Sequence, residues 1–197
     1  MNKKFWYYFL HWTWALPINI VGAIIFGVCK LFKCPSHKYR NGFYVEVPWA
    51  FGGLEAGMFF IIGKGCESCI PHEYGHSIQM LWWGILFAPI IGGPSCARYW
   101  LREFKPKRML LFPFILLLAG FVLLLSTGII TILTNIAWPL IIGAIIFFYL
   151  AGLFIWLVLF EIPKYENDQK VPYDSIWFEG QATELGERAE KNEWDWL

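Results

Sequence analysis

The sequence predicts a mainly α integral membrane protein with three to four membrane helices and a small β-hairpin. Hydrophobic residues make up 57% of the 197 residues and charged residues only 16%, whereas about a quarter of the residues of a soluble protein are charged. The stretch from Met109 to Phe160 contains no Asp, Glu, Lys or Arg. Strand-forming residues gather in a single segment, 43–62. At this length we expect one membrane-embedded domain covering residues 1–197.

The first predicted membrane segment covers about residues 12–29. An aromatic cluster from Phe5 to Phe9 precedes it and suits the headgroup region of a bilayer. A cleaved secretory signal is the alternative, but the apolar part is long and aromatic and no Ala-x-Ala pattern follows it. We therefore interpret this segment as a retained anchor.

The segment 43–62 is predicted to form the β-hairpin. Its two strand-like runs, Phe43–Val47 and Met58–Ile62, are separated by Gly52, Gly53 and Gly57. They could pair as an antiparallel hairpin or stand as two strands with a loop. An edge strand here could hold an extended peptide by main-chain hydrogen bonds, or the strands could simply cover the helix that follows.

A helix is predicted over residues 71–91, because Pro71 suits the first helical position and Gly92-Gly93-Pro94 breaks the pattern. Its length is marginal for a span, and Trp82 and Trp83 suit a membrane interface. We expect a re-entrant or interfacial element.

Residues 109–160 are predicted to form a helical hairpin, because a single span needs about 20 apolar residues and this run is long enough for two. Thr134, Asn135 and Pro139 provide the turn. An uninterrupted apolar hairpin disfavours a transporter or channel.

Basic residues in two loops predict the orientation. They are Lys30, Lys33, Lys38 and Arg40 in one loop, and Arg98, Arg102, Lys105, Lys107 and Arg108 in the other. By the positive-inside tendency both loops are cytoplasmic. The acidic tail, with a predicted C-terminal helix over 173–191, then lies on the same side. Nucleic acid is not an expected partner, because no basic, aromatic-interleaved patch appears outside these loops.

The strongest motif is His72-Glu73-Tyr74-Gly75-His76. On a helix, two histidines four residues apart lie on one face and can share a zinc ion, and Glu73 can act as general base. Gly75 either leaves space beside the metal or allows close helix packing. A third protein ligand is required, and the acidic segment 177–187 offers candidates.

This motif, followed far downstream by Glu179-Gly180-Gln181-Ala182-Thr183, resembles the gluzincin class of zinc metallopeptidases, which includes integral-membrane members of the CAAX-prenyl-protease type. The chain is also similar to short bacterial membrane proteins with a His-Glu-x-Gly-His-Thr-x-Gln motif. The resemblance implies that His72, His76 and Glu179 bind Zn²⁺ and that Glu73 is the base. Glu184 and Asp174 are the alternatives to Glu179.

Thr183 stands where the class usually has aspartate, as the partner of a ligating histidine. A hydroxyl can accept the imidazole hydrogen bond, but without negative charge it raises ligand basicity less. Tyr173 and Tyr74 are candidate donors to a developing oxyanion.

The five cysteines allow a second site. Cys34-x-x-His37 and Cys66-x-x-Cys69 have the spacing of a four-ligand structural zinc site. Disulfides and free thiols are the alternatives.

The function predicted from these patterns is a membrane-embedded zinc endopeptidase in the bacterial cell membrane, with its active site on the cytoplasmic side. Its partners are the lipid bilayer and a peptide or membrane-associated protein substrate. The alternative is a noncatalytic membrane protein in which the same ligands hold a structural or sensory metal and the surface binds partners. Structural zinc sites are usually closed by four protein ligands, so three ligands and Glu73 favour hydrolysis.

Overall fold

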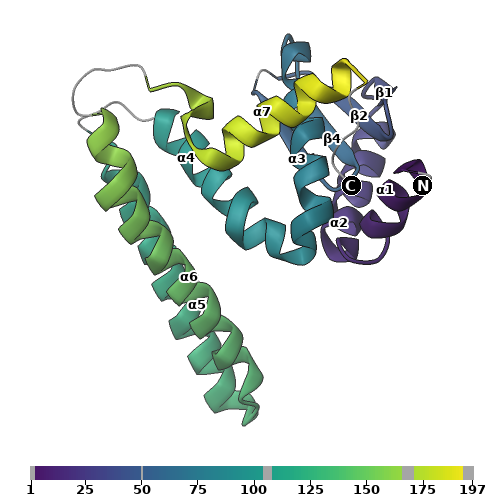
Figure 1. Cartoon of the computed structure of the whole chain (residues 1–197). Helices are drawn as coiled ribbons and strands as arrows, with labels where there is room; N and C mark the ends of the chain where they lie inside the picture. Colours follow the sequence, from purple (N-terminus) through teal and green to yellow (C-terminus); the bar gives the residue numbers. More distant parts are fainter. Residues whose placement is uncertain (1–2, 50, 104–107, 166–170, 193–197) are drawn as a thin grey trace. The chain divides into compact units, whose positions relative to one another are not determined.

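The computed structural model describes residues 3–49, 51–103, 108–165 and 171–192 (Figure 1). The chain divides into two compact units. Unit 1 consists of Met1–Ile90 with Tyr173–Leu197, and unit 2 consists of Ile91–Pro172. The protein is mainly helical, as the sequence predicts, and it contains a small mixed sheet in place of the expected β-hairpin. Its organisation as a single domain stays a prediction.

Unit 1 holds four α-helices among its described residues. These are α1 (Lys3–His11), α2 (Leu16–Leu31), α3 (Ile70–Trp83) and α7 (Trp177–Glu190), with 3-10 turns at Glu67–Cys69, Gly84–Leu86 and Tyr173–Ser175. The predicted first segment, about residues 12–29, corresponds to α2, which begins at Leu16 and meets α1 at a bend of 88°. The helix expected over 71–91 ends at Trp83, where Gly84 has a φ of 54°. Glycine takes this left-handed conformation without steric cost.

A four-stranded sheet precedes α3. Its strands are β1 (Ser36–Tyr39), β2 (Gly42–Val47), β3 (Gly53–Ala56) and β4 (Phe59–Gly63), in the order β1-β2-β4-β3. The two expected strands are present as β2 and β4, but they pair in parallel rather than as an antiparallel hairpin. The reason is β3, which lies between them in the sequence and pairs antiparallel with the edge of β4 opposite β2. The turn between β3 and β4 contains Gly57, where φ is 81°.

Helix α3 forms the centre of the unit 1 core. Tyr74 and Ile78 pack with Tyr7 of α1, Phe60 of β4 and Leu185 of α7. Tyr7 also hydrogen-bonds to Ser77, which in turn bonds to His11. Because α3 is enclosed by a helix, a sheet and a second helix, most of its residues are buried. This enclosure fixes the helix that carries the His-Glu-x-x-His motif.

Unit 2 contains the long apolar helices. Its elements are η3, a π-helical stretch (Ala88–Gly92) that reaches back into unit 1, α4 (Gly93–Glu103), α5 (Leu111–Thr134), α6 (Trp138–Trp156), and the turns Leu157–Glu161 and Ile162–Tyr165. The predicted hairpin is confirmed, with its turn at Asn135 in the left-handed conformation. Two helices, Leu111–Thr134 and Trp138–Tyr165, are long and apolar enough to cross a membrane. The count rises to four if each of two bent helix pairs forms one span.

A buried ion pair lies at the end of the hairpin. Arg98 of α4 and Glu161 are both fully buried, and the guanidinium Nε donates to the Glu161 carboxylate at 3.1 Å. Arg98 also donates to the Pro172 carbonyl, and Lys164 binds the second Glu161 oxygen. Buried charges are tolerated when they are paired and hydrogen-bonded in this way.

Candidate metal centre

His72 and His76 face one carboxylate oxygen. The Nε2 atoms of both rings lie 3.1 Å from Oε2 of Glu179. Among the described residues, these three form the one group of His, Cys, Asp or Glu side chains able to share a metal ion, with ligand atoms within 4.8 Å of one another. His76 and Glu179 are buried and His72 is half-buried. The chain thus brings together residues more than one hundred positions apart.

Close packing of α7 against α3 makes this approach possible (Figure 1). A Cβ added at Gly75 would lie 1.8 Å from the Ala182 carbonyl oxygen, and one at Gly186 would lie 2.2 Å from the Pro71 carbonyl oxygen. Small residues on both helices therefore let the two backbones touch. Of the two interpretations of Gly75, close helix packing is the one that the contacts support.

The hydrogen bonds of Gln79 favour a hydrogen on Nδ1 of His76. The Gln79 Nε2 group donates to the Phe178 carbonyl and to Gln181 Oε1, which leaves its Oε1 facing His76 Nδ1 at 2.8 Å. An amide oxygen only accepts, so Nδ1 carries the hydrogen. A neutral ring then presents the lone pair of Nε2 to a carboxylate oxygen.

Two electron-rich atoms 3.1 Å apart in a buried site need a cation between them or a second proton on the ring. A metal ion satisfies this need for both histidines at once. The donor set of two imidazole nitrogens and a carboxylate oxygen suits zinc, which binds such ligands at about 2.0–2.2 Å in tetrahedral geometry. Bonds of that length separate neighbouring ligand atoms by about 3.3 Å. The distance from each histidine Nε2 to Glu179 Oε2, 3.1 Å, is close to this value.

Thr183 lies on the outer side of the His72 ring. Its hydroxyl oxygen is 3.0 Å from His72 Nδ1. A hydrogen bond from Nδ1–H to this hydroxyl leaves Nε2 free to coordinate, and it orients the ring. Each histidine therefore has one nitrogen facing Glu179 and the other facing a polar side chain, Thr183 or Gln79.

Glu73 is buried between α3 and β3. A Cβ added at Gly53 would lie 2.4 Å from Glu73 Oε1, so the carboxylate occupies the space that a side chain at Gly53 would take. The pKa of Glu73 is raised from 4.5 to about 7, chiefly by burial, with nearby His72 lowering the pKa and Glu179 raising it. A carboxyl with a pKa near neutrality is suited to accept and return a proton.

The other predicted residues lie farther out. The Tyr173 ring is 6.0 Å from the His72 ring, between centroids. Tyr74 is fully buried in the core, stacked on Tyr7. Glu184 is exposed and pairs with Arg188, and Asp174 is exposed in the turn before α7. Neither carboxylate belongs to the metal-binding group.

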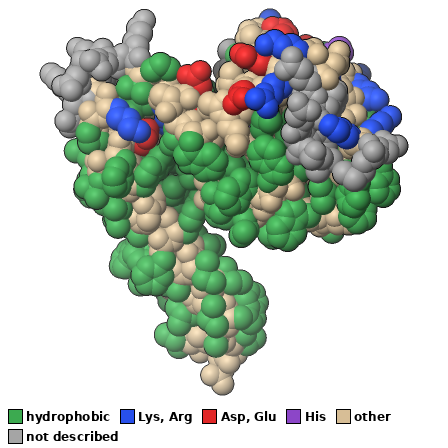
Figure 2. Space-filling view, viewed as in Figure 1, with side chains coloured by type: hydrophobic (Ala, Val, Ile, Leu, Met, Phe, Trp, Pro, Cys, Tyr) green, Lys and Arg blue, Asp and Glu red, His purple; other side chains and the backbone are tan. Residues whose placement is uncertain are grey.

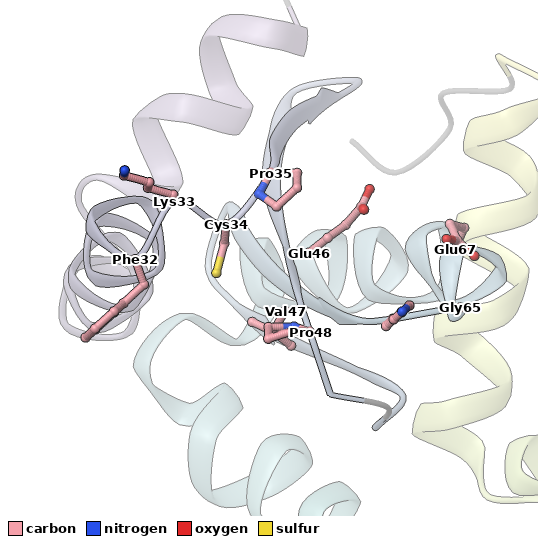
Figure 3. Close-up of a pocket in the computed structure, with 10 residues that line it drawn as sticks. Phe32, Lys33, Cys34, Pro35, Glu46, Val47, Pro48, Gly65 and Glu67 are labelled. Atoms are coloured by element: carbon pink, nitrogen blue, oxygen red, sulfur yellow. The ribbon is translucent and has the colours of Figure 1, made fainter.

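The cysteines do not join a second group of this kind with any other described residue. All five are free thiols, and His37 pairs with Glu46 at 3.3 Å. A pocket of about 370 Å³ lies between the end of α2 and the sheet, lined by residues that include Cys34 and Glu46 (Figure 3). Its lining includes none of the residues of the metal group or Glu73.

Sequence reasoning missed the roles of Gln79 and Gly53. Gln79 stands three residues after His76, hence one helical turn away on the same face, and this spacing was a usable signal. Gly53 has no local signal, because its contact with Glu73 depends on the packing of β3 against α3.

No protein-family model, curated protein or solved structure matches the chain. The function is therefore inferred from the geometry and chemistry of the site.

Proposed function

We propose that the protein is a membrane-bound zinc peptidase. His72, His76 and Glu179 are the metal ligands, Glu73 is the general base, and Thr183 and Gln79 orient the two imidazoles. The observation that carries this proposal is that Nε2 of His72 and Nε2 of His76 both lie 3.1 Å from Glu179 Oε2, with a buried carboxyl one residue after His72.

Each residue has a defined task. When bound, zinc supplies Lewis acidity, which polarises a carbonyl group and acidifies water. Glu73 accepts the proton of the attacking water and returns it to the leaving amine. Its burial beside Gly53 holds the carboxyl in one position and keeps bulk water away from it.

The edge strand β3 favours an extended peptide as substrate. Within the described part of the chain, β3 pairs with β4 alone, and Gly53 of β3 touches Glu73. An extended chain that hydrogen-bonds to the free edge of β3 would lie beside the base. Because the protein contacts a bilayer through at least two apolar helices, we expect a peptide or a membrane-associated protein.

The basic loops around Lys33 and Arg102 support a site on the cytoplasmic face. The bacterial cell membrane is the expected location, because the motif resembles that of short bacterial membrane proteins.

The test combines metal analysis with hydrolysis of a mixture of quenched fluorescent peptides by the purified full chain. We expect a single zinc ion per chain and metal-dependent hydrolysis. Glu73→Gln should keep the zinc and lose hydrolysis, and Glu179→Gln should lose both. Glu187→Gln, an exposed carboxylate on the same helix, is the matched control and should change neither.

Three outcomes would contradict the proposal. Hydrolysis retained by Glu73→Gln rejects the base. Zinc retained by Glu179→Gln rejects the ligand. Zinc bound without hydrolysis by the wild type leaves a noncatalytic metal centre.

A further inference from the structure

Unit 1 exposes a continuous apolar surface. The outer face of α2 carries Ile20, Ile24, Val28 and Leu31, with exposed fractions of 43%, 60%, 44% and 83%. Trp82, Ile85 and Leu86, at and just after the end of α3, are also exposed. In Figure 2 apolar side chains cover the lower part of unit 1, over α2 and the end of α3, and charged side chains gather on its upper part.

The contacts of Tyr74 show that the segments before and after α2 return to the same place. Tyr7, before α2, and Tyr39, after α2, both pack on the Tyr74 ring, with centroids 5.9 Å and 5.7 Å away. A hydrocarbon core about 30 Å thick cannot separate them. With 16 residues, α2 is also only about 24 Å long.

The sheet gives an independent reason. Val45 and Ile61 pack against Ile25 and Phe26 of α2, so the sheet lies along the helix. Among the strands that the structure describes, the edge strands β1 and β3 each have one neighbouring strand. Open sheet edges do not occur within hydrocarbon, where their backbone groups would lack hydrogen-bond partners. A helix covered by such a sheet cannot lie across the bilayer.

The part of the chain between His72 and α5 also begins and ends on the same side of the bilayer. α7 follows the α5–α6 hairpin in the sequence, and two crossings return the chain to its starting side. Glu179 of α7 lies beside His72 and His76 at the start of α3. The start of α3 and the start of α5 are therefore on one side of the membrane.

We propose that α2 and the end of α3 are embedded in a single leaflet and that, among the described helices, only α5 and α6 cross the bilayer. The partner of the apolar surface is the hydrocarbon of that leaflet. Helices α5 and α6 anchor the chain in the bilayer, so the apolar surface of unit 1 stays close to lipid. Lys30 and Lys33, at the end of α2, carry positive charges that are complementary to lipid phosphates. Trp12, Trp14 and Trp82 are also exposed, and tryptophan favours the membrane interface.

The first experiment measures sidedness in the full chain. Single cysteines at Thr13, Lys33, Lys64 and Ile136, in a background without the five native cysteines, are treated with a membrane-impermeant maleimide in right-side-out and inside-out vesicles. We expect Thr13, Lys33 and Lys64 to react in the same vesicles and Ile136, in the hairpin turn, in the opposite ones. Reaction of Thr13 and Lys33 in opposite vesicles would overturn the proposal.

The second experiment measures depth. A fluorophore at Ile24, the middle of α2, is compared with one at Val122, the middle of α5, in vesicles containing lipids with shallow or deep quenchers. We expect the shallow quencher to act best at Ile24 and the deep quencher at Val122. Equal depth at the two positions would make α2 a span, and protection of Ile24 from both quenchers would indicate a protein partner such as a second copy. Either result refutes the proposal, and a label at Val28 provides a second reading of the same face.

Discussion

Replacing Gly75 with alanine tests whether the α3–α7 contact creates the metal centre. In an ordinary helix this change stabilises the protein by up to about 1 kcal/mol. Here the new Cβ would lie 1.8 Å from the Ala182 carbonyl oxygen, whereas ordinary contact begins at 3.4 Å. To relieve this overlap, α3 and α7 would have to separate or slide by much of the difference between 1.8 Å and 3.4 Å.

We expect two measurable effects. Overpacking of this kind costs about 1–3 kcal/mol, so Gly75→Ala should lower the free energy of unfolding rather than raise it. Metal–ligand bonds tolerate displacements of only about 0.2 Å. Loss of a side chain that orients a ligand costs roughly tenfold in metal affinity. A displaced ligand should reduce zinc affinity by at least as much. Thermal unfolding in detergent and competition with a chromogenic chelator measure these quantities.

The controls are other helical glycines. Gly27 of α2 has no atom within 4 Å of an added Cβ, so Gly27→Ala should be neutral or stabilising. Gly186→Ala, whose Cβ would meet the Pro71 carbonyl oxygen at 2.2 Å, should behave like Gly75→Ala. A Gly75→Ala protein that gains stability and keeps full zinc affinity would refute the described crossing of α3 and α7.

Three further predictions concern the surroundings of the ligands. Gln79→Met should weaken zinc binding about 10–100-fold in chelator competition, because His76 loses its hydrogen-bond acceptor; unchanged affinity would argue against this role. Gly53→Ala should displace Glu73 and lower the rate of peptide hydrolysis while zinc content stays the same, and an unaltered rate would contradict the contact. In chelator, unfolding experiments from pH 4 to pH 8 should show stability falling as pH rises, because the pKa of Glu73 is raised from 4.5 to about 7 and its ionisation disfavours the folded state. Glu73→Gln should remove this component, and an identical slope in the variant would show that another group causes it.

The membrane hairpin and the motif helix were predictable because their signals are local. The apolar run from Met109 to Phe160 and the turn residues around Asn135 determine α5 and α6 without reference to the rest of the chain. Pro71 likewise indicates the start of α3. These features depend on neighbours in the sequence, which periodicity and turn preferences describe well.

Long-range pairing could not be predicted in the same way. β2 and β4 are both strand-like, but their parallel register depends on β3, a short strand with two small residues, Gly53 and Ala56. The resemblance to gluzincins pointed to Glu179, yet the contact of Ala182 with Gly75 that brings it to His72 is visible only in three dimensions. Glu184 and Asp174 looked equally acidic in sequence, and burial on one face of α7 distinguishes Glu179 from them.

The order of the chain has a consequence for biosynthesis. The ribosome makes His72 and His76 before the two spans and Glu179 after them. A nascent chain that has not yet completed the hairpin lacks the carboxylate, so the proposed catalytic centre cannot form until both apolar helices have been synthesised. Any activity of that centre therefore begins only when the two apolar helices are also available for insertion into the membrane.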